Sequence, residues 1–388
     1  MLSLTLITAL SSIIPDMRYL EEIGQSENKC NRVIGHQKLH SIGLQIASPL
    51  YVSTHQTFLS YKKTHQFSKT CIDEICLAFR TIRKENNTRG VYAGRAYYVP
   101  SYENPPGPRS SSVTDEKIII QEIKKLFDFA IQNKFDEFGA QIGTILHPFI
   151  SPKVPYGGGS MTPSPDGKTQ VIIETIYGVD EGIQTLPHDS YIVDYKKDCI
   201  LQRSIAVKEA CLETTSQLTI SKVSVPLHVQ KVAVLSNQDI VQLARAFKNF
   251  VTIFGPHRLE FASQPEGIYF LECVPFRPVM SPKGMEAKGQ VKTICSVEDI
   301  PTVTPFDKII YIDPKVIQRR NMDVITTLAF SLPSKRIILY PGSASTAHAA
   351  TILREKGHIL VFIKQELFRS EDHVEVIVKH GEMAVKRL

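Results

Sequence analysis

Hydrophobic residues recur along the chain with two periods, one typical of helices and one typical of strands. A helical pattern begins at Ser112-x-x-Asp115, which resembles a capping box, and it predicts a buried face of Ile119, Ile123, Leu126, Phe127 and Ala130. Further helices are predicted over 237–250, 317–330 and 347–356. Apolar or alternating runs predict strands over 44–52, 170–174, 308–312, 336–340 and 359–363, and a hairpin over 258–275. This mixture predicts a protein of the α/β class.

Three segments interrupt these patterns and predict the division of the chain. Residues 100–112 hold four prolines and four serines and predict a loop, and the Gly- and Pro-rich residues 155–167 predict a flexible stretch. The polar range 281–303 predicts a linker. A chain of 388 residues is long enough for two or three domains. We therefore expect one large domain over 1–280 and a compact α/β domain over 304–388.

Composition and charge exclude several classes of protein. With 43% hydrophobic and 22% charged residues the chain is typical of a globular protein. Its 45 Lys and Arg exceed its 39 Asp and Glu by six, without a dense basic block, so nucleic-acid binding is not predicted and a ligand such as ATP accounts for the charge. The seven cysteines form no CxxC pair, which favours a reducing compartment. No apolar run approaches the ~20 residues that span a bilayer, so we expect a cytoplasmic protein without membrane contact.

The segment 341–357 carries the first candidate chemistry. Small and hydroxyl residues lie between a predicted strand and a predicted helix, and His348 falls in the first turn of that helix. Backbone N–H groups at a helix N-terminus stabilise an anion, and a neutral imidazole can attack a phosphoryl group. The alternative is a histidine that only caps or packs against the helix.

The predicted hairpin over 258–275 carries the second group of residues with candidate chemistry. Glu260 and Glu272 lie six residues on either side of Glu266, so they are expected to face each other on paired strands. Two facing carboxylates repel unless a cation lies between them, and Mg²⁺ prefers oxygen ligands that it shares with phosphates. The alternative is two solvated carboxylates on an exposed face.

Both segments resemble parts of one family, the phosphoenolpyruvate synthases and pyruvate phosphate dikinases. Its phosphohistidine motif is Gly-Gly-x-Thr-x-His-Ala-Ala-x-x-x-Arg-Glu. The matching residues here are Thr346, His348, Ala349, Ala350, Arg354 and Glu355, with Ser343 and Ala344 in place of the glycines. The resemblance implies that 304–388 form that family's swivelling phosphohistidine domain, whose closing strands resemble 373–385.

The hairpin resembles the end of the same family's ATP-grasp domain, Asp-Ile-Glu followed by Leu-Tyr-x-Leu-Gln-x-Arg-Pro. Glu260 falls on the family's metal-binding glutamate, and Glu272 falls where the family has glutamine. Arg258 replaces the aspartate and Val274 replaces the arginine. The resemblance implies a Mg²⁺ site at Glu260 and Glu272.

The rest of residues 1–280 resembles the family's nucleotide-binding region. The sequences 158–167 and 174–183 resemble its Gly-rich strand and the Glu-x-x-Tyr-Gly-Leu-Gly-Glu segment, which implies that Glu174 and Glu181 contact the cofactor. Lys38 is the nearest counterpart of the nucleotide-binding lysine, although His36 holds its literal position. Arg95 keeps the arginine of the family's Val-Arg-Ser-Ser segment, or else is a surface arginine.

Taken together, the resemblance implies an ATP-grasp-like domain joined to a phosphohistidine domain, in an ATP- and Mg²⁺-dependent phosphotransferase. His348, Thr346, Arg95 and Glu181 are its expected catalytic residues, and AMP and phosphate are its expected products. The family's TIM barrel has no counterpart in 388 residues, so we expect a small-molecule acceptor, bound by this chain or by a partner protein. The alternatives are a degenerate nucleotide-binding regulatory module and one subunit of a split dikinase or biosynthetic ligase.

Overall fold

A computed structural model gives the fold of this mixed α/β chain. It describes residues 18–86, 88, 90–101, 105, 108, 111–164, 169–184, 186–215, 219–276, 285–318, 322–332, 336–341, 353, 357–363, 368–379 and 382–388. The chain divides into two compact units. The N-terminal unit holds residues 1–151, 214–221 and 266–274, and the C-terminal unit holds 152–213, 222–265 and 275–388.

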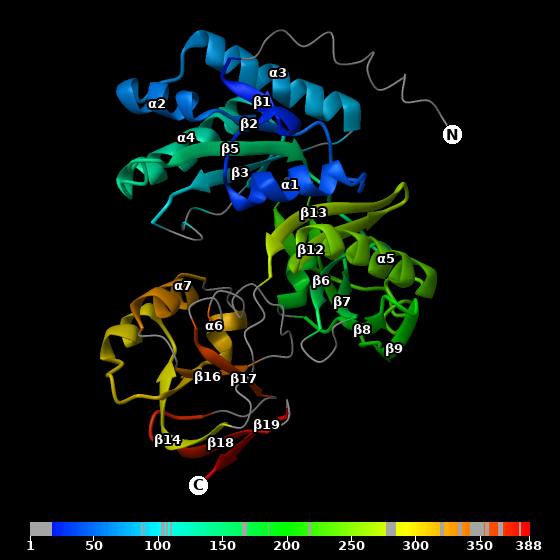
Figure 1. Ribbon diagram of the computed structural model, residues 1–388, viewed down its shortest axis with the longest axis vertical. Helices are drawn as coiled ribbons and strands as arrows, with labels where there is room; N and C mark the ends of the chain where they lie inside the picture. Colours follow the sequence, from blue (N-terminus) through cyan, green and yellow to red (C-terminus); the bar gives the residue numbers. More distant parts are fainter. Residues whose placement is uncertain are drawn as a thin grey trace. The chain divides into compact units, whose positions relative to one another are not determined.

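An antiparallel five-stranded sheet, in the order β1-β2-β5-β3-β4, forms the centre of the N-terminal unit. Its strands are β1 (Leu20–Glu22), β2 (Tyr51–Ser53), β3 (Val91–Tyr98), β4 (Ser111–Val113) and β5 (Gln141–Pro148). The helices are α1 (Asn31–Ser41), α2 (His55–Thr64), α3 (Lys69–Asn86) and α4 (Glu116–Gln132), with a short 3-10 helix η1 (Ile23–Gln25) before them. One face of the sheet packs on α2, α3 and α4, whereas the other face packs on α1 (Figure 1).

The buried face of helix α4 is the one that the helical pattern of the sequence predicts. The five residues expected on its apolar face are all buried, from Ile119 to Ala130. The side chain of Asp115 accepts hydrogen bonds from the backbone N–H groups of Lys117 and Ile118, so Asp115 caps the helix. The expected capping box starting at Ser112 is therefore replaced by a single Asp cap. The strand expected over 44–52 is shorter, because β2 begins only at Tyr51.

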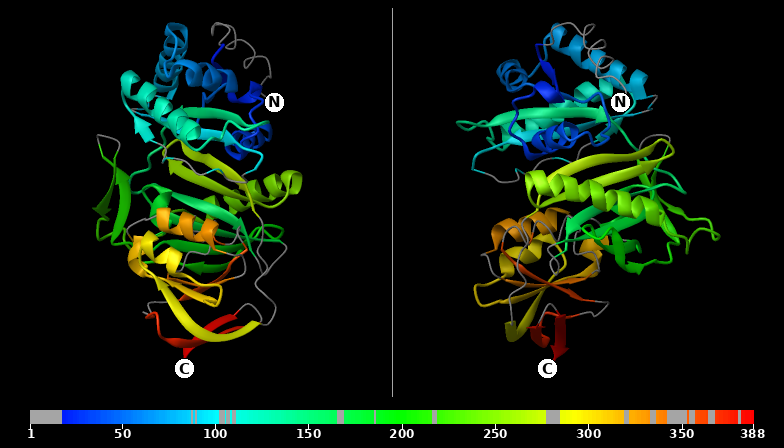
Figure 2. Two further views of the ribbon diagram at one scale, coloured as in Figure 1. Left: turned by 90° about the vertical axis from the view of Figure 1, so that its left-hand side faces the viewer. Right: turned by 45° about the vertical axis from the view of Figure 1, so that its right-hand side comes forward.

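A second sheet has the order β13-β12-β6-β7-β8-β9. These strands are β6 (Gly157–Pro163), β7 (Gln170–Tyr177), β8 (Asp189–Asp194), β9 (Cys199–Ser204), β12 (His257–Gln264) and β13 (Gly267–Pro275), and β10 (Ala210–Thr214) and β11 (Ile220–Ser224) form a separate pair. The predicted hairpin over 258–275 and the predicted strand at 170–174 are confirmed. Helix α5 (Asn237–Phe254), which begins with a capping box at Ser236, packs on β7, β8, β9 and β12 (Figure 2).

Strand β6 corrects the expectation of a flexible stretch over 155–167. Residues 157–162 are buried, and β6 pairs with β7 and with β12. A Cβ atom on Gly159 would lie 2.3 Å from the carbonyl oxygen of Glu174 and 2.4 Å from Cζ of Phe261. The glycines therefore permit a close approach of neighbouring strands and do not provide flexibility.

The third sheet has the order β17-β16-β15-β14-β18-β19. Its strands are β14 (Met285–Ile294), β15 (Ile309–Ile312), β16 (Ile337–Pro341), β17 (Ile359–Ile363), β18 (His373–Lys379) and β19 (Glu382–Arg387), accompanied by α6 (Pro314–Gln318) and α7 (Met322–Ser331). The run from β14 to β17 is parallel, whereas β18 and β19 add antiparallel strands. The strands predicted near 310, 338 and 361 are confirmed, and the predicted helix over 317–330 is present as α6 and α7.

The expectation of a linker over 281–303 is wrong for most of that range. It contains β14 and the 3-10 helix η3 (Val297–Thr302), and β14 lies between β15 and β18. The strand was missed because half-buried and exposed polar residues alternate along Met285–Gln290, so it lacks the apolar run that marks its neighbours. Across the described ranges, no helix has the length and apolar character needed to cross a bilayer.

The close contact at Gly159 gives a test of the fold. We expect Gly159→Ala to lower the free energy of unfolding by about 1–3 kcal/mol, because the new methyl group overlaps a backbone carbonyl and a fully buried ring. Urea denaturation followed by circular dichroism measures this. Gly24→Ala is the matched control, since nothing lies within 4 Å of the added Cβ. Equal midpoints for the two variants would show that β6 does not approach β7 and β12 this closely.

Candidate functional site

The structure places the predicted site residues in two groups. Lys38, Arg95 and Glu272 belong to the N-terminal unit, and Glu174, Glu181 and Glu260 belong to the C-terminal unit. His348 and Thr346 lie outside the described residues, as do most of the predicted helix 347–356 and the matching residues Arg354 and Glu355. We describe each group by itself.

An ion pair between α1 and β13 is the main contact of the N-terminal group. The Nε and Nη2 atoms of Arg32 both lie 3.0 Å from Oε1 of Glu272, and both side chains are about four-fifths buried. Helix α1 approaches β13 this closely because it has a glycine at position 35. A Cβ atom there would lie 2.3 Å from the carbonyl oxygen of Cys273. The sequence Arg32-x-x-Gly35 thus brings a guanidinium to the predicted metal carboxylate.

Aromatic and imidazole rings extend this contact across the sheet. Arg32 donates a hydrogen bond of 3.0 Å to the hydroxyl of Tyr92 on β3. Tyr92 stacks on His147 of β5 with ring centroids 4.5 Å apart, and His147 lies 5.8 Å from His36 of α1. His36 is 2% exposed, and neither of its ring nitrogens has a hydrogen-bond partner within the described part of the chain. The cluster of Arg32, His36, Tyr92, His147 and Glu272 is called the imidazole–guanidinium cluster below.

Burial keeps both imidazoles of the imidazole–guanidinium cluster neutral. It is the main cause that lowers the pKa of His36 to about 3, with the charges of His147 and Arg32 acting in the same direction and that of Glu272 opposing them. It lowers the pKa of His147 to about 4, against the hydrogen bond of 2.8 Å between Nδ1 and the carbonyl of Pro148. Burial also acts to lower the pKa of Arg32, but Glu272 outweighs it and raises that pKa. The cluster therefore has neutral imidazoles beside one ion pair.

Arg95 and Lys38 lie close to the same cluster. Arg95 donates a hydrogen bond of 3.5 Å to the carbonyl of Pro108, and burial together with the charge of Arg32 lowers its pKa. Lys38 follows Arg32 on α1, half-buried. Burial raises the pKa of the Cys273 thiol to about 12, and the positive charge of Lys38 opposes that rise. The charges of Arg32 and Glu272 thus both act on Arg95, and the charge of Lys38 acts on Cys273, the neighbour of Glu272.

A row of polar side chains crosses the second sheet in the C-terminal unit. Glu260 of β12 is paired with Ser160 of β6, and Ser160 is paired with Glu174 of β7. Glu174 is in turn paired with Ser190 of β8. Because side chains alternate along strands, this row shares one face, opposite the buried Leu259 and its apolar neighbours on β6 and β7. The predicted residues Glu174 and Glu260 therefore lie on one polar face.

Each carboxylate of this row has a basic partner. Nη2 of Arg258, 7% exposed, lies 2.9 Å from Oε1 of Glu260. Nε2 of His188 lies 3.4 Å from Oε1 of Glu174. Although burial acts to lower the pKa of His188, Glu174 raises it overall through its hydrogen bond and charge. The second carboxylate oxygen of Glu174 is buried and has no hydrogen-bond partner in the described ranges.

Glu181 lies in the 3-10 helix η2 (Asp180–Gln184), half-buried. A Cβ atom on Gly158 would lie 2.7 Å from the backbone nitrogen of Asp180, so the glycine allows η2 to approach β6. The Gly-rich sequence that suggested a nucleotide site therefore positions the segment that contains Glu181.

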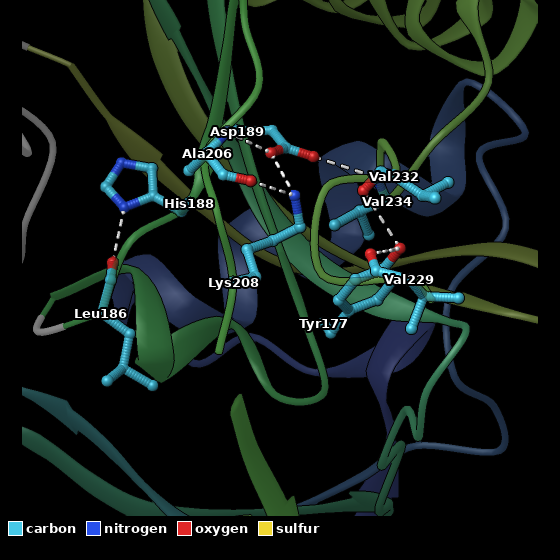
Figure 3. A network of polar contacts seen from close by, with 9 residues as sticks. All are labelled: Tyr177, Leu186, His188, Asp189, Ala206, Lys208, Val229, Val232 and Val234. Atoms are coloured by element: carbon cyan, nitrogen blue, oxygen red, sulfur yellow. Dashed lines mark hydrogen bonds and ion pairs between the residues drawn. The ribbon is translucent and has the colours of Figure 1, made fainter. Parts of the chain in front are cut away.

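A buried ion pair holds Asp189, the first residue of β8, beside the polar face of the second sheet. Nζ of Lys208 lies 2.5 Å from Oδ1 of Asp189, and both side chains are fully buried (Figure 3). Lys208 also donates to the carbonyl of Ala206, and Asp189 accepts from the backbone N–H groups of Ala206 and Val234. Lys208 lies 5.5 Å from the ring centroid of Tyr177. Because Asp189 follows His188 directly, this network positions His188 next to Glu174.

Both groups of site residues also contain side chains that the sequence analysis did not predict. Arg32 was missed because its partner Glu272 lies 240 residues away in sequence. His147 and His188 carry no motif. His36 had a signal, since it holds the literal position of the family's nucleotide-binding lysine.

The donor set does not fit the predicted Mg²⁺ site. Glu260 and Glu272 each form an ion pair with an arginine, at 2.9 Å and 3.0 Å. An arginine at this distance occupies a carboxylate oxygen that Mg²⁺ would use as a ligand. Within the described ranges, no three His, Cys, Asp or Glu side chains come together as a possible metal site.

Comparisons with known proteins give one curated relative and distant structural matches. The chain is 26% identical to a probable phosphoenolpyruvate synthase of Methanocaldococcus jannaschii over 172 residues, which are 44% of this chain and 14% of that protein. No family model matches the sequence. D-alanine–D-alanine ligase of Helicobacter pylori aligns at 12% identity over 64% of this chain and 54% of the ligase, with a TM-score of 0.30. Cdc123 of Schizosaccharomyces pombe aligns at 10% identity over 64% and 84%, with a TM-score of 0.32. Scores this low support no conclusion about this chain.

The buried ion pair gives a test of stability. We expect Lys208→Met to lower the free energy of unfolding by about 3–5 kcal/mol, because the carboxylate of Asp189 stays buried without its cation. Arg245→Met is the matched control. It removes an exposed pair of similar length, Arg245–Asp198 at 3.0 Å, and should cost less than about 1 kcal/mol. Chemical denaturation monitored by fluorescence or circular dichroism compares them, and similar losses in both variants would contradict the buried network.

The buried imidazoles give a test of pH dependence. His36 titrates near 3 in the folded state and near 6.5 when unfolded, so the unfolded state binds more protons between these values. The contribution of this imidazole to the free energy of unfolding is therefore fully present above about pH 6.5. It is lost as the pH falls toward 3, by up to about 1.4 kcal/mol per pH unit for each such imidazole. We expect His36→Gln to weaken this dependence between pH 6.5 and 4.5, whereas His40→Gln, exposed on the same helix, should not. Identical pH profiles for wild type and His36→Gln would refute the neutral, buried imidazole.

Proposed function

We propose that the chain is an ATP-dependent phosphotransferase similar to phosphoenolpyruvate synthase, and that it transfers a phosphoryl group from ATP through His348 to a small-molecule acceptor. The observation that supports this best is a pair of half-buried arginines in the N-terminal unit, Arg32 and Arg95, whose charges influence each other. Burial is the main cause that lowers the pKa of Arg95, and the charge of Arg32 lowers it further. Guanidinium groups favour an anion such as a polyphosphate.

The similarity to a probable phosphoenolpyruvate synthase and the motif around His348 support the chemical type. Both agree with a polar face that holds Glu174, Ser160 and Glu260 on neighbouring strands. ATP-grasp-like binding of the nucleotide by residues 1–280 and a swivelling phosphohistidine domain over 304–388 are parts of the same proposal.

The proposed step balances as follows. A ring nitrogen of His348 forms a bond to the β-phosphorus of ATP, and the bond from that phosphorus to the α–β bridging oxygen breaks, so AMP leaves. Water then releases the terminal phosphate and leaves one phosphoryl group on the imidazole. Arg32 and Arg95 hold the phosphate oxygens and stabilise the charge that develops on the leaving AMP. The acceptor takes the phosphoryl group from His348.

The pairing of both predicted metal carboxylates with arginines favours a second candidate, a nucleotide-binding regulatory module without turnover. The two candidates differ in whether a covalent phosphoenzyme forms.

Labelling with ATP that carries ³²P at the β-position separates them. We expect acid-labile label on the wild-type protein and an intact mass raised by one phosphoryl group, with both lost in His348→Ala. His373→Ala is the control, since it removes an exposed histidine on β18. Label that persists in His348→Ala would exclude His348 as the carrier, and nucleotide binding without label would favour the regulatory module.

A further inference from the structure

His188 lies between two hydrogen-bond acceptors in the C-terminal unit. Its Nε2 atom lies 3.4 Å from Oε1 of Glu174 on β7, and the side chains of His188 and Glu174 are only 8% and 5% exposed. Its Nδ1 atom lies 3.0 Å from the carbonyl oxygen of Leu186, a contact that Figure 3 shows. Because a carbonyl oxygen can only accept a hydrogen bond, Nδ1 carries a proton.

The contact with Glu174 places a second proton on the ring. At neutral pH the proton between Nε2 and the carboxylate belongs to the imidazole, because an imidazole holds a proton more strongly than a carboxylate does. Burial acts to lower the pKa of His188, but the hydrogen bond and charge of Glu174 raise it overall, assisted by the carbonyl of Leu186 and the charge of Asp189. His188 is therefore an imidazolium whose two N–H groups both donate.

The other charged groups on the elements around His188 are largely paired with each other. By element, they are Asp189 of β8 with Lys208, Glu260 with Arg258 on β12, Arg203 of β9, and Asp180 and Glu181 of η2. Since Lys208 lies 2.5 Å from Asp189, Glu174 is the main partner that keeps the proton on His188.

The hydrogen bond to Leu186 connects His188 to the segment that contains Glu181. The backbone N–H of Leu186 donates to the carbonyl of Gly182 at 2.8 Å, and the N–H of Gly182 donates to the carbonyl of Val179 at 3.1 Å. Gly182 and Glu181 both belong to η2. The ring of His188 thus joins β7 to the turn that follows η2.

We propose that His188 is a positioning residue, whose doubly protonated ring bridges Glu174 and the carbonyl of Leu186 and releases this bridge when it loses a proton. The bridge holds η2, and with it Glu181, against the second sheet. This inference rests on the proposed function for the role of Glu181 as a residue that contacts the nucleotide.

Loss of the proton leaves Glu174 buried without a cation. Its second carboxylate oxygen is buried too and has no hydrogen-bond partner in the part of the chain that the structure describes. An unpaired buried carboxylate is costly, so the bridge opens. Because the pKa of His188 is raised above 6.5 in the folded state, the stabilisation is fully present below about pH 6.5 and is lost as the pH rises through the folded pKa.

The first experiment titrates His188 by nuclear magnetic resonance in the full chain, labelled with ¹⁵N at histidine. The ring signals of His188 are those that disappear in His188→Gln. We expect both ring nitrogens to carry protons at about pH 6, and the midpoint to lie above the value of about 6.5 for a free imidazole. A midpoint at or below about 6.5 would overturn the inference, whether or not ATP is a ligand.

A substitution of Glu174 tests the source of the shift. Glu174→Gln keeps the size of the side chain and removes its charge, so we expect the midpoint of His188 to move to lower pH. His228→Gln is the control, because it removes an exposed histidine of the same unit and should leave the midpoint unchanged. Circular dichroism confirms that each variant is folded. An unchanged midpoint in Glu174→Gln would contradict the bridge.

Hydrogen exchange tests the positioning role. We expect the protection factors of the Gly182 and Leu186 amides in the wild type to fall as the pH rises through the midpoint of His188. In His188→Gln these protection factors should be lower at about pH 6 and should not change over the same range. Parallel pH profiles in the two proteins would show that His188 does not hold this segment and would overturn the inference.

Labelling with β-³²P ATP connects the bridge to the proposed function. The ratio of label on the wild type to label on His188→Gln should fall over the same pH range, and a constant ratio would remove His188 from the site. If neither protein takes up label at any pH, the proposed function fails together with the role of Glu181. The titration and the exchange measurements then still decide whether the protonated bridge exists.

Discussion

The ion pair between Arg32 and Glu272 is the contact on which the description of the N-terminal unit depends. It joins the helix that follows β1 to a strand 240 residues later, and it does so at a point where only a glycine allows the two backbones to approach. The pair lies in largely buried surroundings, where an unpaired charge is costly. The positions of Tyr92 and His147 follow from it, because Arg32 donates to Tyr92 and Tyr92 stacks on His147.

The same principle organises the C-terminal unit. A polar row across β12, β6 and β7 keeps its carboxylates close to buried bases, so that Glu260 faces Arg258 and Glu174 faces His188. The fully buried pair of Asp189 and Lys208 fixes the chain beside His188. Each carboxylate in these groups is thus balanced by a side chain of the protein.

Sequence reasoning succeeded where hydrophobic periodicity is strong. The five buried residues of α4 and the limits of β15 and β17 followed from it, because helices and strands that cover a core must repeat their apolar positions. It failed at β6, whose glycines suggested a loop although they permit close packing, and at β14, where charged residues alternate with half-exposed ones. In both strands the deciding factor is the neighbouring strand, which a local pattern does not contain.

The candidate site residues show the same contrast between local patterns and contacts with distant segments. Glu260, Glu272 and Arg95 were predicted from motifs. Arg258, the partner of Glu260, stands in the same motif, whereas Arg32, the partner of Glu272, lies 240 residues away, and a motif does not include an ion pair between distant segments. A crystal structure with a non-hydrolysable ATP analogue and Mn²⁺, with anomalous diffraction to locate the metal, tests the central claim most directly. The account predicts phosphate oxygens within hydrogen-bond distance of Arg32 and Arg95, and no anomalous peak at Glu260 or Glu272. A Mn²⁺ ion coordinated by either glutamate, with its arginine displaced, would contradict it.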